Sequence, residues 1–138
     1  MTTYESELKT ISSSEEVVFN ILSDLNNLGK LNDNTSLTDK IKDLEFDTDS
    51  CSFAVNGFGR VGLRIIERTP LNNIKMASEN APVSFNIDIY IHQIAENQTT
   101  LQLMLNAKLP ATIKMMVGNK LQEGVNAIAD LLAKSLNQ

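Results

Sequence analysis

The sequence predicts an α+β fold in which a curved antiparallel seven-stranded sheet wraps around one long C-terminal helix, within a single domain spanning residues 1–138. Two segments, Ser84–Ile94 and Thr99–Leu109, alternate apolar and polar residues, which indicates paired strands with one buried face. From Thr112 to Leu136 apolar residues recur at spacings of three and four without a proline. This pattern predicts an amphipathic helix roughly 35 Å long.

The N-terminal part predicts one strand followed by two short helices. Residues Thr3–Ser12 alternate as a strand does. Ser13 and Glu16 fit a capping box, which begins a helix whose apolar residues share one stripe. A second short helix is expected at Leu25–Leu31, and the polar segment Asn32–Asp39 predicts an irregular loop.

Four further strands are expected in the middle of the chain. Asn56-Gly57 is a strong hairpin signal because both residues tolerate positive φ. The predicted strands are Ile41–Thr48, Cys51–Val55, Gly59–Arg68 and Asn73–Ser78. A flat sheet of this width is too broad for one helix to cover, so the sheet must curl around the helix. The curl leaves room on the concave side, where the two short helices could form a lid.

Composition excludes several classes of function. The net charge is −5 and basic residues do not cluster in runs, which weighs against nucleic acid and against an anionic membrane surface as partners. The lone cysteine, Cys51, cannot form an internal disulfide. Because the N-terminus lacks the apolar core of a signal peptide and no segment is long enough to span a bilayer, we expect a cytoplasmic protein without stable membrane insertion.

The order of elements resembles that of the START-like superfamily, also called SRPBCC or helix-grip, in particular its polyketide cyclase and lipid-transport branch. The resemblance implies the helix-grip fold, with a deep apolar cavity between the sheet and the C-terminal helix. Members bind lipids, sterols, polyketides or plant hormones, some are cyclases, and others activate chaperones. The matching stretches are Tyr4–Ile11, Ser13–Leu22, Gly59–Arg68 ending at Pro70, Phe85–Ile91 with Thr100–Leu105, and Ile113–Leu136.

Inward positions of the strands and helix define the candidate ligand-binding residues. These side chains could instead fill the space completely as an ordinary core, since protein interiors are close-packed. Gly124 in the middle of the helix stripe and the adaptable Met116 at its edge favour a void. The candidate cavity-lining residues are Phe53, Val55, Leu63, Ile65, Glu67, Ile87, Ile89, Leu103, Leu105, Met116, Val117, Leu121, Gly124 and Ile128.

Few candidate residues carry chemistry. Glu67 shares a strand face with Leu63, so it is either a polar anchor for a ligand or a solvated residue at the strand end, where the alternation breaks. Tyr4 or Ser6 could donate a hydrogen bond to a ligand. His92 is expected on the outer face, away from any cavity. No metal-binding spacing or phosphate loop occurs, so no metal or cofactor is expected.

These features predict a protein that binds a hydrophobic small molecule or lipid and is not catalytic. Two alternatives remain open at the level of sequence. The first is an enzyme of the aromatase/cyclase kind, which would need ionisable groups inside the cavity. The second is a protein-interaction module with a filled core, for which a protein partner is possible.

Overall fold

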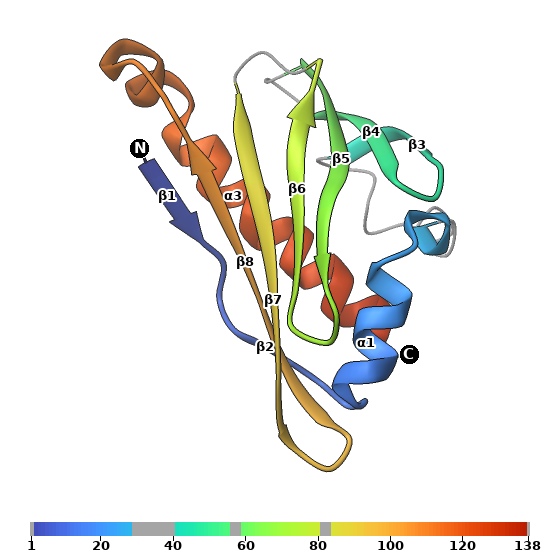
Figure 1. Ribbon diagram of the computed structural model, residues 1–138. Helices are drawn as coiled ribbons and strands as arrows, with labels where there is room; N and C mark the ends of the chain where they lie inside the picture. The colour runs from blue at the N-terminus through green and yellow to red at the C-terminus, as the bar shows by residue number, and fades with distance from the viewer. Residues whose placement is uncertain (1, 29–40, 56–58, 81–83, 138) are drawn as a thin grey trace.

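The predicted sheet and long C-terminal helix are both present in the computed structural model, which describes residues 2–28, 41–55, 59–80 and 84–137 (Figure 1). The helices are α1 (Glu15–Leu22), the 3-10 helix η1 (Leu25–Leu28) and α3 (Ala111–Leu136). The strands are β1 (Thr2–Glu5), β2 (Lys9–Ile11), β3 (Ile41–Phe46), β4 (Ser50–Val55), β5 (Gly59–Thr69), β6 (Asn73–Glu79), β7 (Phe85–Ala95) and β8 (Gln98–Ala107).

All the strands in the described part of the chain belong to one antiparallel sheet. Its order is β1-β8-β7-β6-β5-β4-β3, and β2 pairs with β8 beside β1. The sheet curves around α3, which crosses its concave side from the end of β8 towards α1 (Figure 1). Among the described side chains of α3, the buried ones are Leu121, Val125, Ala129 and Leu132, and their spacing of three and four places them on one stripe facing the strands.

The predicted first strand is in fact two strands, because one extra residue interrupts its pairing with β8. Glu5 pairs with Met104 and Lys9 with Leu101, so three residues on one side oppose two on the other. At this interruption the Ser6 hydroxyl accepts a hydrogen bond from the Leu103 backbone N–H at 2.9 Å. An inserted residue reverses the faces of a strand. Leu8 is therefore 64% exposed, although the simple alternation places it on the same face as the buried Ser6.

The first helix after β2, α1, begins one residue later than the sequence predicts. The N-cap of α1 is Ser14, whose hydroxyl accepts from the Val17 backbone N–H at 3.3 Å. Ser13, the predicted cap, instead uses its carbonyl oxygen to accept from the Thr99 hydroxyl at 2.7 Å. The second predicted helix is present as η1. Its last residues, and the loop predicted at Asn32–Asp39, lie outside the described residues.

Polar contacts hold α3 along one edge of the sheet, beside β1 and β2. The Gln122 side-chain amide donates to the Glu5 carbonyl at 2.9 Å, and the Asn126 side chain accepts from the Glu7 N–H at 3.2 Å. Near the C-terminus, the Asn137 side chain accepts from the Ser12 N–H at 2.7 Å and donates to the Thr10 carbonyl at 3.1 Å.

An ion pair between Lys9 and Asp130 adds to this edge. The hydrogen bond to Asp130 raises the pKa of Lys9 above its ordinary value. The contact with Asp130 therefore favours the protonated, charged form of Lys9.

The close approach of β5 and β6 requires glycine at position 62. A Cβ built on Gly62 would overlap the Glu79 carbonyl oxygen and lie 3.2 Å from the Glu79 Cβ. Because backbone atoms cannot move aside cheaply, we predict that Gly62→Ala lowers the free energy of unfolding by about 2 kcal/mol. Chemical denaturation followed by circular dichroism measures this loss.

The matched control is Gly124→Ala, since a Cβ there meets no atom of the described residues within 4 Å. Gly124→Ala should raise the free energy of unfolding by about 0.5–1 kcal/mol, because alanine favours the helix. Equal effects of the two substitutions would contradict the steric explanation.

Candidate functional site

A small apolar cavity lies between the concave face of the sheet and α3. Its volume is about 50 Å³. Strands β4, β5, β7 and β8 form one wall, and the middle of α3 forms the other. The lining residues are Phe53, Val61, Leu63, Phe85, Ile87, Leu105, Lys120, Leu121, Gly124, Val125 and Ile128.

The position of Gly124 explains why the space is open. Gly124 lies on the cavity side of α3, between Leu121 and Val125. A Cβ at this position would meet no described atom within 4 Å, so the helix surface here is set back from the strands. A larger residue would occupy this space, as apolar side chains do in close-packed interiors.

The structure brings half of the predicted lining residues to the cavity. These are Phe53, Leu63, Ile87, Leu105, Leu121, Gly124 and Ile128. Three others, Ile65, Ile89 and Leu103, are buried in the core but do not line the cavity. The side chains of Val55 and Val117 lie outside the described part of the chain.

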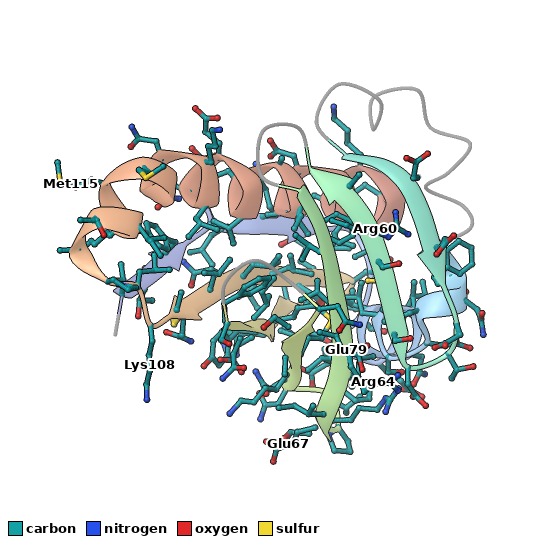
Figure 2. The ribbon with its side chains drawn as sticks, turned by 90° about the horizontal axis from the view of Figure 1, so that it is seen from above. Arg60, Arg64, Glu67, Glu79, Lys108 and Met115 are labelled. Carbon is teal, nitrogen blue, oxygen red and sulfur yellow. The ribbon has the colours of Figure 1, made fainter. Side chains whose placement is uncertain are left out.

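Two of the predicted lining residues are exposed, and the prediction was wrong for both. A register shift between Ile65 and Glu67 interrupts the pairing of β5 with β6, so Glu67 leaves the inner face and points away from α3 (Figure 2). Met116 is 75% exposed because the first turns of α3 extend beyond the sheet. The adjacent Met115 also points into solvent, as Figure 2 shows.

Sequence reasoning missed four lining residues. Val61, Phe85 and Val125 follow the same alternation or helical stripe as residues that were predicted, so the pattern could have found them. Lys120 had no such signal, since a lysine beside an apolar stripe usually belongs to the solvated face. Its long apolar stem allows it to border a cavity although the residue is exposed.

The cavity is small compared with sites that hold drug-sized ligands, which are typically about 300–1,000 Å³. A volume of about 50 Å³ exceeds the space that one water molecule needs. The side chains therefore fill most, but not all, of the space under α3. A ligand larger than a few heavy atoms requires α3 and the strands to move apart.

A larger groove of about 410 Å³, lined by both polar and apolar groups, lies around Gly62 at the β3–β4–β5 end of the sheet. Arg60 donates to Glu45 at 3.0 Å and to the Ser52 hydroxyl at 2.9 Å. Arg64, next to the groove, donates to Glu79 at 2.7 Å, and Figure 2 shows this pair on the side of the sheet away from α3. These charged groups neutralise one another, which indicates a structural role.

Groups able to act as acids or bases are scarce near the apolar cavity. His92 is exposed, as expected, and Tyr4 is half-buried against the core. The Ser6 hydroxyl already donates to the Glu7 carbonyl at 3.0 Å. Within residues 2–28, 41–55, 59–80 and 84–137, no group of three or more His, Cys, Asp or Glu residues is placed to hold a metal ion.

Solved structures of similar shape identify the fold. Norcoclaurine synthase from Thalictrum flavum, in complex with a transition-state analogue, matches with a TM-score of 0.75 and 14% identity over 99% of this chain and 96% of that chain. A START superfamily protein from Mycobacterium smegmatis matches with a TM-score of 0.63 and 15% identity over 96% and 97%. The Aha1 dimer from Colwellia psychrerythraea matches with a TM-score of 0.64 and 18% identity over 99% and 97%.

This chain has the START-like, helix-grip fold. No protein-family model matches the sequence, and no curated protein matches it significantly. At these identities the structural likeness establishes the fold alone. The START-like fold is a ligand-binding fold in some proteins, such as the synthase, and it occurs as a dimer in Aha1.

No helix among the described residues is both long enough and apolar enough to cross a lipid bilayer.

Cys51, in β4, is buried, as expected for a small core residue. Burial, together with the nearby Asp47 carboxylate, raises the pKa of its thiol to about 12. The thiolate is the reactive form of cysteine, so almost none is present near pH 8. We predict that the folded protein reacts with Ellman's reagent at least about 100-fold more slowly than the protein unfolded in guanidinium chloride.

The unfolded sample provides the control, because its single thiol should react at the rate of a free cysteine. Rapid, stoichiometric reaction of the folded protein would show that Cys51 is accessible and the burial described above is wrong.

Proposed function

We propose that this protein binds a hydrophobic small molecule or lipid between the concave face of the sheet and α3, without catalysing a reaction. The observation that carries the proposal is the open space beside Gly124, which is lined by apolar side chains of both the sheet and the helix. Apolar lining with few polar groups is typical of sites for hydrophobic ligands. The single titratable group in the described lining, Lys120, supports binding better than proton-transfer chemistry.

The way α3 is attached supports widening of the cavity. The polar contacts that hold α3 join it to Glu5, Glu7, Lys9, Thr10 and Ser12, at the β1–β2 edge. Opposite this edge, the described residues of α3 that line the cavity are apolar or glycine, apart from Lys120. Contacts between apolar side chains have no fixed direction, so they can reform around a ligand. A small rotation of α3 about the β1–β2 edge would therefore admit a larger molecule.

A protein-interaction module with a nearly filled core is the second candidate function. The observation that favours it is the small volume of the cavity, about 50 Å³. Aha1 from Colwellia psychrerythraea, which shares the fold, is a dimer. The two candidates differ in whether purified protein takes up an apolar molecule.

Gly124→Leu tests the proposed site directly. The leucine side chain should fill the space beside the helix, so binding of the uncharged dye N-phenyl-1-naphthylamine should weaken at least about tenfold. The substitution should also raise the free energy of unfolding by about 1 kcal/mol, because leucine favours a helix more than glycine does. Dye fluorescence measures binding, and chemical denaturation measures stability.

Asn119→Leu is the matched control, since it adds the same side chain to an exposed position of α3. It should leave dye binding within about twofold of the original protein. Failure of the original protein to bind the dye, together with native mass spectra free of co-purified ligand, would contradict the proposed function and favour the interaction module.

A further inference from the structure

Two consecutive methionines lie at the start of α3, where the helix extends beyond the sheet. Met115 is 87% exposed and Met116 is 75% exposed, so they are the most exposed large apolar side chains in the described part of the chain. Figure 2 shows Met115 pointing into solvent at this end of the helix. Neither side chain packs in the core, and both thioether groups are therefore open to small reagents in water.

The other sulfur atoms of the described residues are partly or fully shielded. Met76, on β6, is only 6% exposed, and Met104, on β8, is half-buried. Cys51 is buried, and burial raises the pKa of its thiol to about 12. The susceptibility of a cysteine to oxidants follows its thiolate character and its exposure, and both are low here. An oxidant that arrives from solvent therefore meets the two helix methionines first.

We propose that Met115 and Met116 form an oxidation site, at which a hydroperoxide converts each thioether to a sulfoxide before it reaches the other sulfur atoms of the described residues. A lone pair of the sulfur forms a bond to one peroxide oxygen while the O–O bond breaks. The departing hydroxide takes the proton of the transferred oxygen and leaves as water. Sulfur is oxidised and the peroxide is reduced, so no further reactant is needed. This inference is independent of what the cavity binds.

The fold should tolerate this reaction at the start of α3. A sulfoxide is polar, and a polar group in a close-packed core is costly unless it is hydrogen-bonded. At positions 115 and 116 the new oxygen stays in water, so the buried stripe of α3 keeps its contacts with the sheet. Exposed sulfoxides are also accessible to methionine sulfoxide reductases, which reverse the reaction. Oxidation would thus change the projecting end of α3 from apolar to polar in a reversible way.

Peptide mapping by mass spectrometry, after timed exposure of the full chain to hydrogen peroxide, tests the proposal. Trypsin cuts after Lys114 and Lys120, so both methionines appear on the peptide Met115–Lys120. In the folded protein they should react at least about tenfold faster than Met76, and within about twofold of their own rates in guanidinium chloride. On unfolding, the rate at Met76 should rise to match theirs, because its shielding is lost.

Two further measurements report on the surface and the fold. The oxidised protein should elute earlier from a phenyl column, with an unchanged midpoint of chemical denaturation, and methionine sulfoxide reductases should restore the original elution. Replacing both helix methionines, Met115→Leu with Met116→Leu, should remove most of the shift in elution. Met76→Leu is the matched control, since it removes a buried methionine, and it should keep the shift.

Three results would overturn the proposal. The first is oxidation of Met76, Met104 or Cys51 at the rate of the helix pair. The second is a rate at the pair more than about tenfold below that in guanidinium chloride, which would show that the two side chains are shielded. The third is loss of the folded state once only the pair has reacted, because this would show that Met115 and Met116 support the core.

Discussion

The structure depends on burying one apolar stripe of α3 against a sheet that is wider than the helix. The buried residues described on that stripe, spaced by three and four, require the strands to curve towards them. The curved sheet brings β3 and β4 round α3, but its strands do not all lie equally close to the helix. The helix packs most closely against β8, β1 and β2. The open space beside Gly124 is thus a consequence of covering a broad sheet with one helix.

This asymmetry separates a fixed edge of the helix from an adaptable one. Along β1 and β2, side-chain amides of α3 satisfy backbone groups that the interrupted strand leaves without ladder partners, such as the Glu7 N–H. The interruption at Ser6–Leu8 therefore contributes to the attachment of α3. On the cavity side, the described lining residues of α3 other than Lys120 are apolar or glycine, and contacts between apolar side chains have no fixed direction. The helix can therefore stay in place at the β1–β2 edge while its cavity side moves to admit a ligand.

The sequence predicted the regular parts of this fold and missed the irregular ones. The long hairpin of β7 and β8 and the helix α3 have repeating patterns, so the inner face of the hairpin, and that of α3 at Leu121, Val125 and Leu132, were predicted correctly. The two register shifts, at Ser6–Leu8 and Ile65–Glu67, each reverse the faces that follow. No residue type marks them, because an inserted residue is defined only by its partner strand. Glu67 was misplaced for this reason. Met116 was misplaced because the sequence does not show where the sheet ends beneath the helix.

The second register shift also bears on where the cavity can open. Beyond it, Arg68 donates to the Ser23 carbonyl at 2.8 Å and to Asp49 at 2.6 Å, which ties the end of α1 to the turn before β4. The start of α1 is tied to β7, since the Glu15 N–H donates to the Gln93 side chain at 2.9 Å. With both ends fixed and Val18 fully buried, α1 is poorly suited to be the lid that the sequence suggested. The adaptable edge of α3 then offers the easier route to the cavity.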